Sequence, residues 1–415
     1  MSNNELEVLE HIQSVSDKHL LETMHHDYDT HINMLAYMEE FLYENKCILY
    51  GGLAIDTLMP RSKKIYTKYT LPDFDCYHHN ALVISKKLAD YLSKKGYTLV
   101  MVKKGVLFDK TYRIYANTVA VADITAIPKV FYQSLIRNAS DINGRFVIQK
   151  EFLRYSLHWE FAKPKSSSWR WNKLYTRYVS TYNELKLSSN TVNSKMSLQE
   201  YPNIHPMFEM MQDFTLSSSF IHNGIQRYLK GVLPLQWSNA FGVYQYLVND
   251  VSEFKNDLEK FVTRKLGSSA KVTQVSHVAM LFSVPDMYYF KLVRKNEPSI
   301  MLCSVYNLQN VCISYIKINK EKIAVIDFIL SMVNYIIMDP LFSEELHEEV
   351  KHMTLLLQKH LESYTSNQHK RYRFNLKCIG NELTFTESIK KWLSGKVNVY
   401  KPAKKVTKKV TVNVH

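Results

Sequence analysis

Three aspartates in the first third of the chain have the type and spacing of a metal-dependent phosphoryl-transfer site. Asp73 and Asp75 are separated by a single residue, and Asp123 lies in the alternating run Val119–Ile124. Side chains alternate faces along a strand, so Asp73 and Asp75 are predicted to point the same way. Three carboxylates on adjacent strands repel each other unless cations lie between them. Two divalent ions, roughly 3.5–4 Å apart, would neutralise them and bind the attacking and leaving oxygens of a phosphoryl transfer.

Two glycines precede these aspartates, at the end of the apolar run ILYGG. Gly51 and Gly52 would let backbone amides approach a triphosphate and begin a helix whose N-terminus favours anions. Paired glycines also occur in ordinary tight turns, so the pattern gains weight only together with the aspartates. A basic loop, Arg61–Lys68, separates the two motifs and is a candidate contact for RNA phosphates.

Three cations further along the chain are candidates for binding the triphosphate. Arg170, Lys173 and Arg177 recur at i, i+3 and i+7, which places them on one face of a helix. They would hold the triphosphate as pyrophosphate leaves. The alternative is a solvated basic helix face.

The surrounding pattern supplies the elements that would position these residues. We expect helices within residues 5–46, a helix over 80–95 with Asn80 as its N-cap, and helical structure over 149–187. Strands are expected at 97–102, 108–115 and around Asp123, and a polar linker at 188–195.

The second half repeats this order in degenerate form. Phe220–Ile225 resembles the strand that enters Gly51, and residues 249–261 resemble the helix at 80–95. In this alignment Leu235 and Trp237 take the places of Asp73 and Asp75. Leu302 or Cys303 takes the place of Asp123. The copy would therefore carry no chemistry.

Composition limits the partners and the compartment. The 415 residues carry a formal net charge of +14 and many tyrosines, which suits single-stranded nucleic acid. The five cysteines have no C-x-x-C spacing, which predicts free thiols in a reducing compartment. The N-terminus has no pattern of a secretory signal, and the longest apolar run is too short to cross a membrane.

The glycine turn, the Asp-x-Asp pair and the third aspartate together resemble the DNA polymerase β-type nucleotidyltransferase superfamily. Within it, YGGLAIDTLMP, LPDFDCYHHNAL, ADITAIP, LRYSLHWEFAKPKSSSWRWNKLYTRY and KIAVIDFILSMVNYII resemble the poly(A) polymerase catalytic subunit of large DNA viruses, the poxvirus-type group. The resemblance covers roughly residues 45–340.

This resemblance implies template-independent addition of AMP from ATP to RNA 3′ ends, with two Mg²⁺ or Mn²⁺ ions. Asp73, Asp75 and Asp123 would be both catalytic residues and metal ligands. Gly51, Gly52, Arg170, Lys173 and Arg177 would bind the nucleotide. It also implies either a homodimer or a cap-methyltransferase-like processivity subunit as partner, no membrane, and a location in the host cytoplasm, in the viral factory, or in the virion.

The predicted fold class is α+β: a nucleotidyltransferase-type mixed sheet with flanking helices, followed by a degenerate second nucleotidyltransferase-like domain. The predicted boundaries are 1–47 (N-terminal helices), 48–190 (catalytic domain), 191–395 (degenerate domain) and 396–415 (basic tail). The alternatives are another terminal nucleotidyltransferase such as a uridylyltransferase, a non-catalytic RNA-binding processivity protein, and a structural virion protein. Loss of the carboxylates in the copy but not in the first half opposes the last two.

Overall fold

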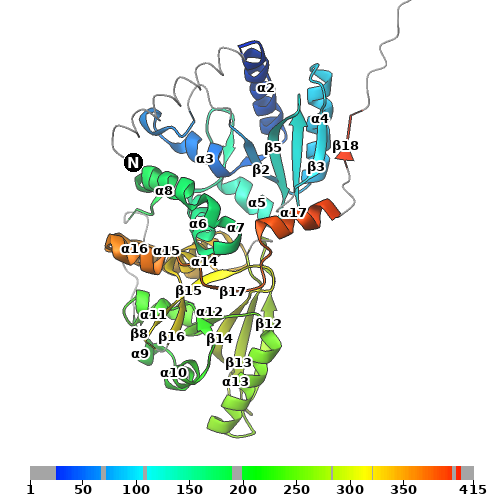
Figure 1. Cartoon of the computed structure of the whole chain (residues 1–415). Coiled ribbons are helices and arrows are strands. Elements are labelled where there is room, and N and C mark those ends of the chain that lie inside the picture. The colour runs from blue at the N-terminus through cyan, green and yellow to red at the C-terminus, as the bar shows by residue number, and fades with distance from the viewer. Residues whose placement is uncertain are drawn as a thin grey trace, which may run out of the picture.

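The computed structural model describes residues 25–66, 72–105, 110–188, 199–281, 284–319, 321–394 and 399–402. The first part of the helical region expected at residues 5–46, up to residue 24, lies outside the described residues. So do Lys68, nearly all of the expected linker and most of the basic tail. Two eight-stranded mixed sheets dominate the described part, one at the top and one at the bottom of Figure 1. This confirms the α+β fold class.

The first sheet has the spatial order β18-β3-β4-β5-β2-β1-β7-β6. Its strands are β1 (Ile48–Leu49), β2 (Phe74–His78), β3 (Met101–Lys104), β4 (Thr111–Ala116), β5 (Val119–Ala126), β6 (Ser140–Asp141), β7 (Phe146–Val147) and β18 (Val399–Tyr400). Its helices are α2 (His25–Glu44), α3 (Gly51–Leu58), η1 (Arg61–Lys63), α4 (Ala81–Lys94), α5 (Lys129–Asn138), α6 (Lys150–Ala162), α7 (Pro164–Ser167), η2 (Ser168–Arg170) and α8 (Trp171–Leu185). The strand, the glycine turn and the helix that follows it lie where the sequence predicted them. Asn80 precedes α4 as expected, but its side chain makes no capping hydrogen bond.

The second sheet has the order β12-β13-β14-β11-β9-β16-β15-β17. Its strands are β9 (Ile221–His222), β11 (Tyr244–Val248), β12 (Lys271–His277), β13 (Met287–Val293), β14 (Ile300–Asn307), β15 (Ile313–Ile318), β16 (Glu321–Ala324) and β17 (Cys378–Ile379). The helices of this half are α9 (Tyr201–Ile204), α10 (Phe208–Ser217), α11 (Ile225–Tyr228), α12 (Leu235–Phe241), α13 (Val251–Leu266), α14 (Ile326–Met338), α15 (Glu344–Glu362), α16 (Ser366–Tyr372) and α17 (Phe385–Ser394). A short ribbon of β8 (Gln199–Glu200) and β10 (Val232–Leu233) lies beside it.

The two sheets share one topology apart from their added edge strands, β18 beyond β3 in the first sheet and β17 beyond β15 in the second. β1 pairs antiparallel with β2 and parallel with β7, and β9 pairs in the same two ways with β11 and β16. β2 runs parallel to β5, as β11 does to β14. Even the register shift recurs, after Ile114 in the first sheet and after Phe290 in the second. A shared irregularity of this kind supports duplication, because bulges are kept as features of a fold. The domain boundaries at 47, 190 and 395 stay predictions.

The registers correct the alignment that the sequence suggested for the copy. Leu235 and Trp237 begin helix α12 and lie on no strand. The backbone amide of Tyr50 donates to the carbonyl of Asp75 at 2.9 Å, and Asn223 donates likewise to Gln245 at 2.8 Å. Gln245 thus stands where Asp75 stands, and Val243 where Asp73 stands. The sequence alignment failed because it followed the apolar pattern and missed the helix inserted before β11.

The position equivalent to Asp123 is also corrected. Asp123 is the register partner of Asp75 on β5. Gln245 has Ser304 as its partner on β14. The residue is therefore Ser304, and Leu302 and Cys303 precede it. The copy has lost every carboxylate, as predicted, although at positions other than those predicted.

The two halves meet along helices α6 and α14, which pack against each other between the sheets (Figure 1). The contact contains buried polar groups. Arg154 of α6 donates to Asn334 of α14 at 2.8 Å, and His158 lies 2.7 Å from Asp327. Asp327 also accepts two hydrogen bonds from Arg373, at 2.8 and 2.7 Å. The buried apolar residues of both sheets form one continuous core around this contact.

A disulfide contradicts the prediction that all five cysteines are free thiols. Cys312, just before β15, is bonded to Cys378 of β17, while Cys47, Cys76 and Cys303 are free and buried. The bonded pair is 66 residues apart in sequence. Short-range spacing could not reveal it, because only the pairing of β15 with β17 brings the two together.

The C-terminal segment adds a strand to the edge of the first sheet. Val399 and Tyr400 form β18 on the edge of the first sheet, antiparallel to β3. The Tyr400 hydroxyl donates to Asp90 of α4 at 2.7 Å. Part of the predicted tail is thus a strand of the first sheet.

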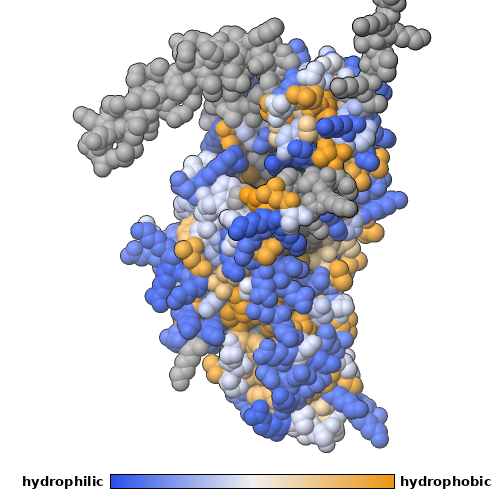
Figure 2. Space-filling view, turned by 45° about the vertical axis from the view of Figure 1, so that its right-hand side comes forward, coloured by the Kyte–Doolittle hydropathy of each residue, from blue (hydrophilic) through white to orange (hydrophobic). Residues whose placement is uncertain are grey.

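The surface shows hydrophobic residues scattered among hydrophilic ones on the face seen in Figure 2. Among the described residues, no helix combines the length and the apolar character needed to span a membrane.

Candidate active site

The three aspartates converge at one end of the first sheet. Asp75 lies on β2 opposite Asp123 on β5, and Asp73 immediately precedes β2. Burial, followed by the charges of Asp123 and Asp73, raises the pKa of Asp75 to about 7. Burial and the charge of Asp123 also raise the pKa of Asp73. The carboxylates are therefore close enough to repel each other, as the sequence predicted.

The glycine turn lies directly against this cluster. Gly51 has φ +71, a left-handed conformation that side chains disfavour, and a Cβ there would lie 2.5 Å from Oδ2 of Asp75. Two independent features thus require glycine at position 51: the left-handed backbone conformation and the lack of room for a side chain beside Asp75. Gly224 of the copy has the same φ of +71, but its neighbour Ile323 is apolar. The turn survives in the copy without a carboxylate beside it.

Asp123 is held by a cation that the sequence did not single out. The guanidinium of Arg113, opposite Asp123 on β4, donates from Nε to Oδ1 at 2.8 Å and from Nη2 to Oδ2. The alternation within β4 places Arg113 on the active-site face, but only the register with β5 shows which carboxylate it meets. In the copy, Tyr289 faces Ser304 at the same register position. The arginine and the carboxylate are absent together.

The carboxylate cluster fits a divalent cation. Mg²⁺ and Mn²⁺ prefer carboxylate oxygens, and binding of such an ion would displace the proton of a carboxyl group with a pKa near 7 into solvent. Among the described residues, no three acidic, histidine or cysteine side chains are already arranged around one point. Asp123 is engaged by Arg113 in this arrangement, so ion binding would require that pair to open.

The three predicted triphosphate cations are in three different situations. Arg170 ends η2, before α8 begins, and pairs with the partly buried Glu160. Lys173 lies on α8, and its charge lowers the pKa of Asp73 against the larger effects of burial and Asp123. Arg177 reaches the glycine turn, where its Nη1 would lie 3.2 Å from a Cβ on Gly52. The three do not form the single uniform face that their spacing suggested.

Glu160 explains the position of Arg170. Burial alone would raise the pKa of Glu160, but the charges of Lys163 and Arg170 lower it to about 2. Ser167 also donates to the same carboxylate. Arg170 is therefore part of a partly buried ionic cluster, although its charge still lowers the pKa of Asp75.

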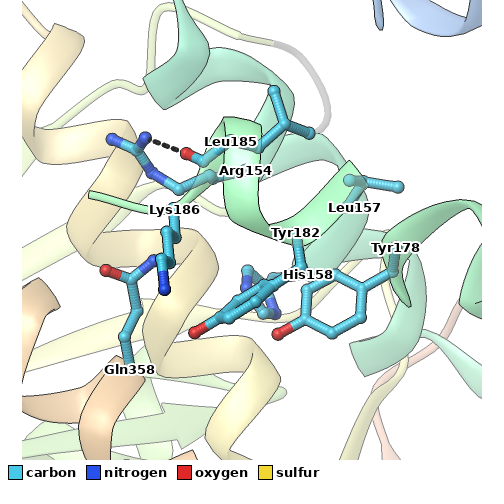
Figure 3. Close-up of a pocket in the computed structure, with 8 residues that line it drawn as sticks. All are labelled: Arg154, Leu157, His158, Tyr178, Tyr182, Leu185, Lys186 and Gln358. Atoms are coloured by element: carbon cyan, nitrogen blue, oxygen red, sulfur yellow. Dashed lines mark hydrogen bonds between the residues drawn. The ribbon is translucent and has the colours of Figure 1, made fainter. Parts of the chain in front are cut away.

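A small pocket between α6, α8 and α15 is a different kind of site (Figure 3). None of the three aspartates lines it; the lining residues are Arg154, Leu157, His158, Tyr178, Tyr182, Leu185, Lys186 and Gln358. Arg154 donates to the carbonyl of Leu185 at 2.6 Å, the bond drawn in Figure 3, and His158 is engaged by Asp327. Because these groups already have protein partners, the pocket is best explained as part of the contact between the two halves.

The fold and the site together define a nucleotidyltransferase-like protein. Residues 36–167, which contain the glycine turn and all three aspartates, match the family model described as poly(A) polymerase catalytic subunit. This confirms over that segment the resemblance found from the sequence.

The matching relatives are proposed poly(A) polymerase catalytic subunits of African swine fever virus. The proteins of isolates Pig/Kenya/KEN-50/1950 and Tick/Malawi/Lil 20-1/1983 are each 30% identical over 131 residues, which is 31% of this chain and 27% of the relative. The match thus spans about a quarter of the length of these relatives. The crystal structure of the Megavirus polyadenylate synthase is similar with a TM-score of 0.75 and 16% identity, over 97% of this chain and 86% of that one. That likeness shows a shared fold over nearly the whole chain.

Proposed function

We propose that this protein is a template-independent poly(A) polymerase, which adds AMP from ATP to the 3′ end of RNA. The observation that carries the proposal is the register pairing of Asp75 with Asp123, with the turn at Gly51 packed against Asp75. The family match to residues 36–167 covers this whole arrangement and supports the choice of reaction. The net charge of +14 supports a polyanionic substrate.

Each residue of the site has a role in this proposal. Asp73, Asp75 and Asp123 would hold divalent cations, which supply charge neutralisation and lower the pKa of the primer hydroxyl when bound. Gly51, Gly52 and the first turn of α3 would receive the phosphates through backbone N–H groups. Lys173 and Arg177 would neutralise the triphosphate, and Arg170 would contribute at longer range from its pair with Glu160.

The experiment is extension of an oligo(A) primer by the purified chain, with each of the four nucleoside triphosphates separately and with Mg²⁺ or Mn²⁺. We expect extension with ATP to exceed the others by about tenfold to a hundredfold, since one unpaired buried polar group costs about 1–3 kcal/mol. Preferred extension with UTP would overturn the poly(A) assignment in favour of a uridylyltransferase. No extension with any nucleotide would overturn the enzymatic proposal.

The partners follow the same proposal. RNA and ATP are the substrates, and the chain would act either as a homodimer or with a cap-methyltransferase-like processivity subunit. The location in the host cytoplasm or the virion stays a prediction, and the disulfide between Cys312 and Cys378 is at variance with the reducing compartment first expected.

A further inference from the structure

The segment Arg61–Tyr66 contacts both α3, which begins at the glycine turn, and α8, which carries Lys173 and Arg177. The buried carboxylate of Asp56 on α3 accepts hydrogen bonds from the backbone amides of Ile65 at 2.6 Å and Tyr66 at 3.0 Å. The ammonium of Lys64 lies 3.6 Å from the same carboxylate. Hydrogen bonds to an ionised acceptor are the stronger kind. The end of the segment is therefore fixed against α3.

The start of the segment is fixed to the other helix. The ammonium of Lys63 donates to Glu184 of α8 at 2.7 Å. Residues 61–66 thus bridge α3 and α8, although the two helices lie more than a hundred residues apart in sequence. The sequence suggested RNA contact for this basic loop, but Lys63 and Lys64 both have carboxylate partners within the protein.

The bridge places the Tyr66 hydroxyl in the space left by the missing side chain of Gly52. A Cβ on Gly52 would collide with the hydroxyl of Tyr66 and would lie 3.2 Å from Nη1 of Arg177. The φ of Gly52 is not in the left-handed region, so its backbone does not require glycine. The requirement at this position is room for Tyr66 and Arg177.

Tyr66 also contacts the cation of α8. The guanidinium carbon of Arg177 lies 6.0 Å from the centre of the Tyr66 ring. Burial raises the pKa of Tyr66, a charge and a hydrogen bond from Arg177 lower it, and the charges of Asp75 and Asp73 raise it. The Tyr66 hydroxyl and Nη1 of Arg177 thus both lie beside Gly52, one residue after the glycine that contacts Asp75.

We infer that Tyr66 is a positioning residue, which holds Arg177 over the first turn of α3 so that this guanidinium and the helix N-terminus receive the same triphosphate. The inference rests on the proposed function. Arg177 has a long side chain with many accessible rotamers, so a fixed position beside Gly52 needs a contact that holds it. The hydroxyl of Tyr66, anchored through Asp56, keeps it over Gly52.

The test is Tyr66→Phe, which retains the ring and removes the hydroxyl. We expect the KM for ATP, and the Kd for the non-reacting analogue α,β-methylene-ATP, to rise about fivefold to tenfold, the effect of one hydrogen bond. The kcat and the Kd for oligo(A) should stay within twofold. Tyr91→Phe is the matched control. It removes a tyrosine hydroxyl on α4 that donates to Glu40 of α2 at 3.0 Å.

A double-mutant cycle tests the contact itself. Gly52→Ala should weaken binding of the analogue strongly in the wild-type chain, where the methyl group displaces Tyr66. It should weaken binding much less in Tyr66→Ala, where the space is free. Additive effects would show that the two residues act independently and would overturn the inference.

The outcomes separate this inference from the proposed function. If the wild-type chain extends RNA but Tyr66→Phe has an unchanged KM for ATP and an unchanged Kd for the analogue, only the role of Tyr66 is overturned. Equal losses of melting temperature and kcat in Tyr66→Phe and Tyr91→Phe would reduce Tyr66 to a structural residue. Wild-type chain that neither extends RNA nor binds the analogue overturns both.

Discussion

Arg113 and Asp123 form a two-point ion pair across β4 and β5, so the third carboxylate of the site is occupied by a side chain of the protein itself. The pair is specific to the first sheet, because Tyr289 and Ser304 replace it in the second. The hydrogen bond to Asp123 raises the pKa of Arg113, against burial, so the guanidinium stays charged. Arg113 thus balances the carboxylates when no cation is bound.

Arg113→Ala is expected to make the fold more dependent on divalent cations. Without Arg113, the Asp123 carboxylate repels that of Asp75 in the metal-free protein. A bound cation would relieve this repulsion, and it would no longer compete with the guanidinium for Asp123. The melting temperature in EDTA should fall by a few degrees and recover in Mg²⁺ or Mn²⁺, and the Kd for Mn²⁺ should decrease. Lys103→Ala is the control, since Lys103 pairs with Arg113 in register but does not contact Asp123. A Mn²⁺ affinity unchanged from wild type would contradict this role.

Asp75→Asn is expected to abolish AMP addition and to change how stability depends on pH. The pKa of Asp75 is raised from 3.8 to about 7 in the folded protein. The stability contributed by its protonated form is therefore full below about pH 4 and is lost as the pH rises through 7. In EDTA the variant should melt roughly 2 °C or more above wild type at pH 8 and equal to it near pH 4.

The control for this comparison is Asp257→Asn, on the exposed face of α13. It should show no such pH-dependent gain. Thermal melts of both variants between pH 4 and pH 8 check the prediction, and equal melting temperatures of Asp75→Asn and wild type at pH 8 would contradict it.

Arg373→Met is expected to destabilise the protein strongly without touching the site. Arg373 and Asp327 are fully buried, and the guanidinium is surrounded by the rings of Phe161, Tyr175, Tyr178 and Phe374. Removing one partner of a buried ion pair costs about 3–5 kcal/mol, because the other charge stays buried. Urea unfolding measures the change.

Arg371→Met provides the comparison, because Arg371 is exposed two residues earlier. Its expected effect is within about 0.5 kcal/mol. Adding Asp327→Asn to Arg373→Met should recover part of the loss. A small effect for Arg373→Met would mean that the buried network does not hold the two halves together.

Cys378→Ser is expected to lower the free energy of unfolding by about 2–4 kcal/mol under non-reducing conditions, because the disulfide closes a long loop. A reductant should remove the difference from wild type. Alkylation of the unfolded, unreduced chain should label three cysteines, Cys47, Cys76 and Cys303. Labelling of all five would contradict the disulfide.

The sequence by itself determined the local parts of the site. A β-prone run, two glycines, a helix, an Asp-x-Asp pair and an aspartate in an alternating run depend on contacts within a few residues, and the structure places each of these elements where the pattern predicted them. The duplicated order of elements was also visible. Loss of the carboxylates in the copy could be predicted from the sequence, because both the predicted and the structurally equivalent positions hold uncharged residues.

The tertiary structure decided whatever depends on which strand or helix lies beside another. The two-residue alternation of side chains along a strand determines which face of the sheet Arg113 lies on. Its partner, Asp123, follows only from the register of β4 with β5. The same holds for Ser304, the disulfide of Cys312 with Cys378, and the meeting of Tyr66 with Gly52. These contacts join residues from 10 to 66 positions apart, and no local pattern encodes them.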